Sequence, residues 1–518
     1  MRGVSFRGLL SDISASVVVY LVALPLCLGV ALASDTLPIT GIIAGIIGGI
    51  VVGLISKSSL SVSGPAAGLT AIVAGAVGTL PSYNIFLLSL VIAGFFQICF
   101  GFLKAGQIAD YIPYSIIKGL LAAIGLILIL KQIPYFFGFA NLLERHELLK
   151  TSGNSNLFSA PLQAVRNPDP GALMIGGFSL LILLLFERKQ IRNNSFLRYL
   201  PASLMAVASG ILLNFLFNHF IPGWFLGRGH LVAMPVFETP ASLVSALSFP
   251  DLSGFNYWET WSVAIVIAVI ASIETLLSIE AVDNLDPQKR VTPPNHELKA
   301  QGFGNIASGM LGGLPVTSVI VRSSANAEAG AYSKRSTIFH GVLLLMSLVY
   351  FSHVLNLIPL SSLSAILIVT GYKLTKPSVY IEMKKRGWEQ FVPFLVTVVA
   401  ILQTDLLKGV FIGLVTGFIF GLRRNFLSAV TVMRDADRLV LKFGKDVSFL
   451  NHGLVKNQLR HVGDHMRVYI DVTRVESVDR DIVNLVNTFI HQARQRGISV
   501  HVRYSSANKN RLFTEADS

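Results

Sequence analysis

Two stretches of this chain interrupt apolar segments in the same way: Ser63-Gly64-Pro65-Ala66-Ala67-Gly68-Leu69-Thr70 and Gly312-Gly313-Leu314-Pro315-Val316-Thr317-Ser318. In each of them, glycine and proline stand immediately before a short apolar run. Proline suits the first turn of a helix, where its missing N–H costs nothing. Each stretch therefore predicts a half-helix that begins inside a membrane.

Longer apolar segments surround both stretches. A helix that crosses a bilayer needs about 20 apolar residues. The clear candidates are 13–33, 40–56, 84–104, 115–135, 171–187, 198–218, 258–280, 336–353, 388–404 and 406–422, and the interrupted ones are 64–80, 296–312, 315–330 and 358–374. This makes about fourteen spans, with the Gly/Pro stretches third in each group of seven. Matching interruptions in two halves indicate an inverted repeat with a binding site between the halves.

Composition divides the chain into a membrane part and a soluble part. Of its 518 residues, 52% are hydrophobic and only 14% charged, with a mean hydropathy of +0.62, whereas a soluble chain carries about 25% charged residues. We predict a transmembrane domain at 1–425, a linker at 426–435 and a small soluble α/β domain at 436–518. In that domain, 439–443, 468–472 and 498–503 are expected as strands and 480–494 as an amphipathic helix.

The net charge of +13 does not indicate nucleic-acid binding, because the basic residues cluster at the ends of apolar runs. They alternate between loops as the positive-inside rule requires, for example at Arg188–Arg198, Lys384–Arg386 and Arg423-Arg424. An even number of spans then places both termini in the cytoplasm. We expect the protein to lie in the cell membrane, either an inner or a plasma membrane. Cys27 and Cys99 give neither a disulfide framework nor metal-ligand spacing. No enzyme motif is present, and we expect no cofactor and no metal other than a possible Na⁺.

The starts of the two half-helices are candidate anion-binding residues. A helix N-terminus carries unpaired N–H groups and about half a positive charge, so two such ends form an anion site without a metal. The small residues there let an anion approach the backbone: Ala66, Ala67 and Gly68 in one, and Thr317, Ser318 and Val319 in the other. The alternative is that small residues merely allow close helix packing.

Three further residues are candidates because polar groups at membrane depth are costly. Arg322, about two turns after the second half-helix start, can supply positive potential; alternatively it reaches the cytoplasmic interface. Glu274 and Ser278 share a helix face and can hold a proton or Na⁺ that offsets the charge of the anion. The alternative for Glu274 is a structural pair with Arg322.

These residues resemble those of the sulfate permease (SulP) family of anion transporters. The resemblance rests on Ser61–Pro65, Ile273–Leu277, Gly312–Pro315 with Val321–Ser323, and the run Gln301-Gly302-Phe303-Gly304-Asn305. It implies a seven-plus-seven inverted repeat in which a core domain (spans 1–4 and 8–11) moves against a gate domain, as in an elevator. Glu274 then corresponds to the family's acidic residue of span 8 and Arg322 to its span-10 arginine.

The resemblance also bears on the substrate. Many members carry Pro-Gln and a later Tyr in span 1, where this chain has Leu24–Val30 without either polar group. Cyanobacterial bicarbonate transporters look similar there, and their Asp-x-x-x-Thr pair resembles Glu274 and Ser278. This favours bicarbonate, with sulfate next. The glutamate in place of the aspartate counts against Na⁺ coupling and leaves H⁺ coupling open.

The tail resembles a STAS domain and implies dimerisation or regulation, with a homodimer expected. In members that switch by phosphorylation a serine follows the position of Asp479, which Arg480 follows here. Four alternatives stay open: a nucleobase permease of the same architecture, an anion channel or exchanger, a voltage-driven motor, and a sensor that acts through the tail.

Overall fold

The computed structural model describes residues 6–107, 113–139, 159–166, 168–186, 201–236, 246–404, 406–435, 437–444, 446–448, 451–464 and 466–504. The predicted basic loop Arg188–Arg198 and the last residues of the predicted soluble domain, 505–518, lie outside these ranges. The chain divides into two units, one comprising 1–385 with 394–412 and the other 386–393 with 413–518.

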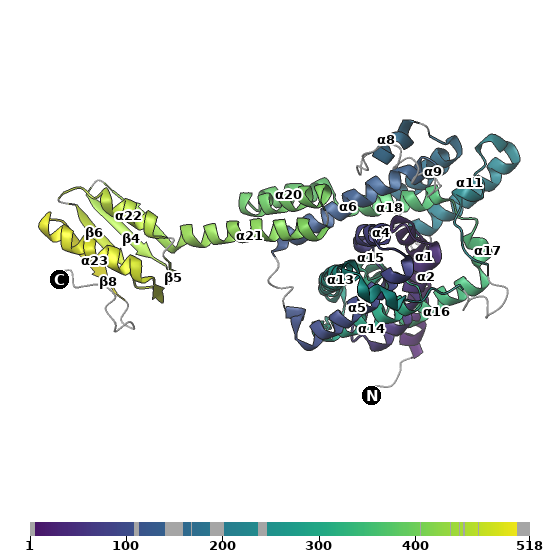
Figure 1. Cartoon of the computed structure of the whole chain (residues 1–518), viewed down its shortest axis with the longest axis horizontal. Helices are drawn as coiled ribbons and strands as arrows, with labels where there is room; N and C mark the ends of the chain where they lie inside the picture. Colours follow the sequence, from purple (N-terminus) through teal and green to yellow (C-terminus); the bar gives the residue numbers. More distant parts are fainter. Residues whose placement is uncertain are drawn as a thin grey trace. The chain divides into compact units, whose positions relative to one another are not determined.

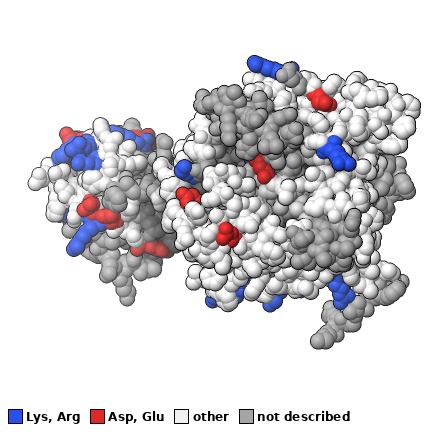
Figure 2. All heavy atoms as spheres, turned by 45° about the vertical axis from the view of Figure 1, so that its right-hand side comes forward, with Lys and Arg blue, Asp and Glu red and all other residues white. Residues whose placement is uncertain are grey.

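The larger unit is helical, and every apolar segment predicted to span contains a helix (Figure 1). Among the described residues, six helical segments are long and apolar enough to cross a membrane: Gly8–Ala33, Pro38–Ile55, Tyr83–Phe102, Tyr114–Phe136, Ala202–Phe220 and Trp258–Leu285. Figure 2 shows that charged residues are sparse on the described part of the one face of this unit that it displays, as a lipid-facing surface requires. The structure thus supports a polytopic membrane fold, and the number of about fourteen spans stays a prediction.

The helices have the following bounds. The first half of the chain contains α1 (Phe6–Ala33), α2 (Pro38–Ile47), α3 (Gly53–Ile55), α4 (Thr70–Thr79), α5 (Tyr83–Phe102), α6 (Tyr114–Phe136), α8 (Ser159–Arg166), α9 (Pro170–Phe186) and α11 (Ala202–Phe220). The second half contains α13 (Trp258–Leu285), α14 (Pro294–Met310), α15 (Ile320–Glu328), α16 (Arg335–Tyr350), α17 (Ser352–Leu355), α18 (Leu360–Leu374), α19 (Pro377–Lys385), α20 (Trp388–Gln403) and α21 (Leu406–Ala429).

The two Gly/Pro stretches meet as a pair of short strands, not as helix starts. Strand β1 (Ser63–Pro65) pairs antiparallel with β2 (Val316–Ser318), so that Pro65 faces Val316. The helical backbone begins only afterwards, at the 3₁₀ turn η2 (Ala67–Leu69) before α4, and at Ile320 of α15. The prediction that Pro65 and Pro315 begin the half-helices was therefore wrong. A proline fits an extended strand as well as a first helical turn, because both accept its fixed φ and its missing N–H.

The smaller unit contains an α/β domain. Its sheet has the order β3-β4-β6-β8, formed by β3 (Val430–Arg434), β4 (Arg438–Phe443), β6 (Arg467–Asp471) and β8 (Ser499–Arg503), and β5 (Asp446–Val447) pairs with β7 (Ser477–Val478). Helices α22 (His452–Arg460) and α23 (Arg480–Gln495) pack on the sheet through one apolar core. The predicted strands and helix are confirmed. The predicted linker is corrected, because β3 lies within it and pairs with β4, and Val430 is buried in the core.

Candidate functional site

A cavity of about 420 Å³ lies beside the crossing of β1 and β2. Its walls come from α1, α6, α13, α15 and α18 and from the turn η2, all in the larger unit. Of the residues predicted for binding or coupling, six line it: Ala67, Gly68, Glu274, Ser278, Val319 and Arg322. Residues about 250 positions apart in the sequence thus meet at one cavity.

The other three predicted binding residues lie behind the cavity wall. Ala66, Thr317 and Ser318 are buried and do not line it. The Ser318 side chain instead shares a hydrogen bond of 2.6 Å with the Ser61 hydroxyl, and its backbone N–H donates to Thr275 Oγ1 at 3.3 Å. The hydroxyl of Thr317 has no hydrogen-bond partner in the described part of the chain. Ser318 therefore ties β2 to the segment before β1 and to α13, and the neighbours of these three residues form the cavity surface.

Arg322 is a buried cation in the first turn of α15. It is 0% exposed, so its side chain does not reach an interface. The helix begins at Ile320, which places Arg322 within its first turn and corrects the predicted distance of two turns. Its Nη2 donates to Cys27 Sγ at 3.3 Å, while Nε and Nη1 have no partner among the described residues. Such a charge, buried without a counter-ion, is a costly arrangement that a bound anion would relieve.

The free backbone N–H groups at the start of α15 lie at the positive end of the helix dipole. The first N–H groups of any helix have no partner within it. That of Val319 donates to the carbonyl of Val62 at 3.0 Å, which leaves those of Ile320, Val321 and Arg322 for a ligand. All three of these residues line the cavity. The start of α15 thus combines orphan donors, the positive end of the dipole and a guanidinium.

Glu274, on α13, faces the turn η2 that follows strand β1. Its carboxylate accepts a hydrogen bond from the backbone N–H of Gly68, and its Oε2 is buried without a partner among the described residues. No ion pair joins it to Arg322 in that part of the structure, so the structural pair considered as the alternative is absent there. Ser278 lies one turn further along α13 and also lines the cavity. An unpaired carboxylate oxygen beside a hydroxyl can take a proton or a small cation.

Sequence reasoning missed residues at the cavity and behind its wall. Cys27 is buried and does not line the cavity, yet it is the one described side chain that contacts Arg322 through a hydrogen bond. Tyr114 and Lys118, at the start of α6, line the cavity. Both lie near the end of a predicted span, where tyrosine and lysine are common at the membrane interface. No pattern in one sequence indicates which helix end will face a distant half-helix.

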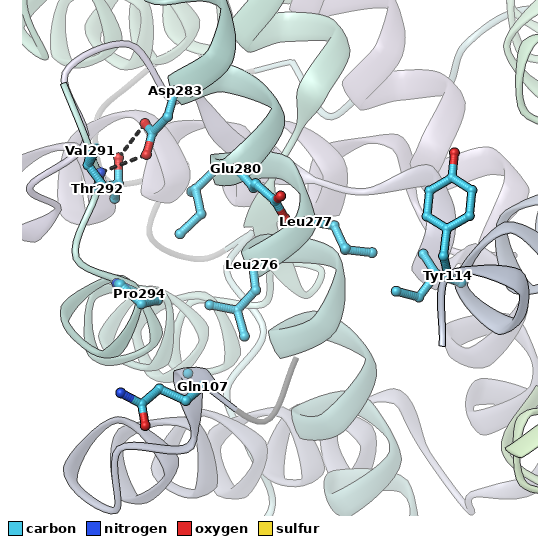
Figure 3. A pocket seen from close by; sticks show the side chains of 12 residues that line it. Gln107, Tyr114, Leu276, Leu277, Glu280, Asp283, Val291, Thr292 and Pro294 are labelled. Atoms are coloured by element: carbon cyan, nitrogen blue, oxygen red, sulfur yellow. Dashed lines mark hydrogen bonds between the residues drawn. The ribbon is translucent and has the colours of Figure 1, made fainter. Parts of the chain in front are cut away.

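A second cavity of about 460 Å³ adjoins the first, between the end of α13 and the start of α14. The two share Tyr114, Ile117, Leu277 and Glu280. Figure 3 shows Glu280 on α13 with Tyr114 across from it, and Asp283 held by the backbone N–H and the hydroxyl of Thr292, at 2.6 and 2.7 Å. Asp283 is thus occupied with the loop that follows α13, and Glu280 remains exposed where the two cavities meet.

This fold and this buried site define a membrane transport protein. Comparison with known families agrees, since residues 9–397 match the Sulfate permease family. The match covers most of the chain, and the protein belongs to that family.

Relatives and solved structures give the same class. The chain is 28% identical to "Putative sulfate transporter YvdB" of Bacillus subtilis (strain 168), over 82% of this chain and 75% of that one. It is 25% identical to "Bicarbonate transporter BicA" of Synechocystis sp., over 87% and 77%. Its fold is similar to the transmembrane domain of a cyanobacterial BicA (TM-score 0.62, 22% identity, 80% and 98% covered) and to SLC26A9 (TM-score 0.73, 13% identity, 95% and 84% covered).

Proposed function

We infer that this protein is a secondary active transporter of a small inorganic anion, bicarbonate or sulfate, coupled to Na⁺ or H⁺. The observation that carries the proposal is the buried guanidinium of Arg322, with Nε and Nη1 unpaired, at the edge of a cavity that also holds an unpaired carboxylate oxygen. The anion would bind at the start of α15 and the co-ion at Glu274 and Ser278.

The charges around the cavity support coupling to a cation. Within the described residues its lining carries two cations, Arg322 and Lys118, and two carboxylates, Glu274 and Glu280. These charges cancel when all four groups are ionised. A monovalent anion alone would leave the site negative, and a negative charge moved through a bilayer is costly. One Na⁺ or H⁺ at Glu274 restores neutrality, so anion and co-ion favour each other's binding. For sulfate, two positive charges would be needed, which favours bicarbonate.

The larger mechanism and the setting of the protein follow from the same proposal. Core and gate domains of a seven-plus-seven repeat would move past each other to expose the site alternately on the two sides. The two termini would lie in the cytoplasm of a cell whose inner or plasma membrane holds the protein as a homodimer. The C-terminal unit, with its helices packed on the sheet, would be a STAS domain, in which Asp479 caps α23 and Arg480 is the first residue of that helix.

The nucleobase permease is the second candidate, and the cavity disfavours it. A nucleobase presents several donors and acceptors, which side-chain amides and carboxylates match. Among the described residues that line the cavity, Asn284 is the only side-chain amide, and the two carboxylates, Glu274 and Glu280, are balanced by the cations Arg322 and Lys118. Competition by uracil for anion uptake would support this candidate.

Uptake into proteoliposomes tests the proposal. We expect wild-type protein to accumulate bicarbonate or sulfate, with saturation, when a Na⁺ or H⁺ gradient is imposed, and Glu274→Gln to lose gradient-driven accumulation. The matched control is Glu259→Gln, an exposed glutamate in the first turn of the same helix, which should accumulate anion like the wild type. Non-saturating flux would indicate a channel, and normal accumulation by Glu274→Gln would remove that residue from coupling.

A further inference from the structure

Helix α14 carries a row of buried polar side chains that the proposed transport step does not use. Glu297, Gln301, Asn305 and Ser308 are each 0 or 1% exposed. Their spacing of three and four residues places them on one face of the helix. They include both polar members of the run Gln301–Asn305. Each of the four side chains makes at least one hydrogen bond, and Gln301 Oε1 alone among their polar atoms has no partner within the described residues. Such bonds matter because a buried donor or acceptor without a partner is costly.

The side chain of Asn305 binds the backbone of strand β2. Its Oδ1 accepts from the N–H of Val316 at 2.6 Å, and its Nδ2 donates to the carbonyl of Val316 at 3.0 Å. Across the strand pair, Val316 faces Pro65, which has no N–H to donate. The side-chain amide of Asn305 therefore makes, at the edge of β2 away from β1, the two backbone hydrogen bonds that a third strand would make there.

Gln301 holds strand β1 one turn earlier on the same helix. Its Nε2 donates to Ser63 Oγ at 2.7 Å and to Glu297 Oε1 at 3.0 Å. Glu297 in turn accepts from Ser56 Oγ at 2.6 Å, just before β1. One face of α14 thus holds both crossing strands through two neighbouring amides.

The same row is tied to the helix that carries Glu274. Nδ2 of Asn305 also donates to Gln97 Oε1 at 2.6 Å, and Gln97 Nε2 donates to Ser272 Oγ of α13 at 3.4 Å. The glycine of the run allows this closeness, since a Cβ at Gly302 would lie 2.6 Å from the carbonyl oxygen of Gly94 in α5. Any residue other than glycine would push α14 away from α5.

We propose that Gln301 and Asn305 are positioning residues that fix the spacing of β1 and β2, and with it the anion-binding start of α15. The proposal rests on the proposed function, because it assigns these amides to the same anion site. Neither residue lines the cavity, so each acts through the strand that it holds. When Asn305 is lost, β2 and the N–H groups that follow it move relative to Arg322, and the anion binds less tightly.

The experiment compares Asn305→Leu with a matched variant, Asn214→Leu, in the full-length protein. Asn214 is also buried and makes the same pair of backbone bonds, with Leu226, but away from the cavity. We expect Asn305→Leu to raise the KM for bicarbonate or sulfate about tenfold or more, since three buried hydrogen bonds are lost, two of them to the backbone of β2. The maximal rate per folded protein should change much less, and Asn214→Leu should leave the KM unchanged.

Amide hydrogen exchange gives a readout that does not depend on transport. In detergent-solubilised protein, the segment 311–319 should exchange faster in Asn305→Leu than in the wild type or in Asn214→Leu. An unchanged exchange rate in that segment, an unchanged KM, or an equal rise of KM in both variants would overturn the positioning role. Wild-type protein that takes up no anion under any gradient would overturn the proposed function instead, with the exchange result still deciding whether Asn305 holds β2.

A milder pair of variants covers the case that Asn305→Leu does not fold. Ser63→Ala and Gln301→Met each remove the hydrogen bond between α14 and β1 from one side. Each should raise the KM about threefold, and the double variant should raise it no further than Gln301→Met alone, because both remove one interaction. Full additivity of the two effects would contradict a shared contact.

Discussion

The guanidinium of Arg322 lies directly against the backbone of Gly64, so closely that a Cβ at position 64 would overlap its Nη1. The two residues come from the two crossing segments, since Gly64 is in β1 and Arg322 in the first turn of α15. Glycine at this point is therefore required by the position of a charge and not by the backbone conformation. It lets the cation of one half reach the strand of the other.

This contact predicts the effect of Gly64→Ala. Arg322 is buried and its Nη1 occupies the place that a Cβ at position 64 would take, so the added methyl group must displace the guanidinium or separate the strands. Overpacking of this kind costs about 1–3 kcal/mol, which corresponds to a rise of roughly 5- to 150-fold in the KM for the anion. The control is Gly75→Ala in α4, where a Cβ meets nothing within 4 Å. Equal anion uptake by Gly64→Ala and the wild type would show that Arg322 does not set the affinity.

A second glycine touches the other charge of the site. A Cβ at Gly68 would lie 2.8 Å from both carboxylate oxygens of Glu274. We expect Gly68→Ala to displace the carboxylate and to lower gradient-driven accumulation more than it changes the KM for the anion. In that background Glu274→Asp, whose carboxylate is shorter by one methylene, should restore part of the accumulation. The measurement is the ratio of internal to external anion under a fixed Na⁺ or H⁺ gradient, with Gly78→Ala as the unaffected control. A selective loss of anion affinity in Gly68→Ala would argue against a coupling role for Glu274.

The sequence was sufficient to predict that two interrupted segments meet. Glycine and proline at matching positions indicate a break in each helix, and the cost of Glu274 and Arg322 in a membrane marks both as exceptional. The structure brings these residues to one cavity. This prediction was possible because polar groups and broken helices carry a large energetic cost in lipid, and the residues that cause the cost can be recognised from the local sequence.

Other features left no local signal. A strand of three residues has no periodicity, so β1 and β2 could not be told from helix starts. The inward or outward direction of Ser318 depends on its partner Ser61, which lies 257 positions away. The roles of Gln301 and Asn305 also depend on such distant contacts, and the sequence could mark their run only by its resemblance to a family. Long-range pairing decides which of several small residues faces the cavity.

The end of α13 predicts a pH-dependent stability. Burial alone would raise the pKa of Asp286, but hydrogen bonds from the Arg290 side chain, at 2.6 and 3.1 Å, and from backbone N–H groups hold its pKa below the usual value. A lowered pKa stabilises the folded state at pH values above the unfolded pKa, about 3.9. This contribution is lost as the pH falls through the lower pKa of the folded state.

Asp286→Asn should therefore lower the apparent melting temperature of the detergent-solubilised protein at pH 7. The loss should correspond to about 2 kcal/mol, as for a hydrogen bond to a charged group. The difference from the wild type should remain constant down to about pH 4 and narrow below it. Melting curves at pH 7, 5 and 3.5 measure it, with Asp251→Asn, an exposed helix cap, as the control. A difference that grows toward low pH would contradict the assignment.

An ion pair at the other end of the cavity predicts an outer closure. Lys131 Nζ of α6 lies 3.5 Å from Asp35 Oδ2, in the turn after α1. Along both helices the order is the same, with cavity-lining residues first, then an apolar layer that includes Leu128, and then the ion pair. In the proposed mechanism α1 belongs to the core domain and α6 to the gate domain. The pair would then hold the two domains together where the cavity is closed.

Lys131→Ala should loosen this closure. A partly exposed ion pair contributes up to about 1 kcal/mol, so the population open on the outer side should rise about fivefold at most. The measurement is the reaction rate of Val30→Cys, a cavity-lining position, with an impermeant thiol reagent added outside; protein without that cysteine gives the background. Lys131→Arg should react slowly like the wild type, and exchanging the two charges, with Lys131→Asp and Asp35→Lys, should restore slow reaction. Equal rates for Lys131→Ala and Lys131→Arg would mean that this ion pair does not hold the closed state, because only the alanine variant removes the charge that attracts Asp35.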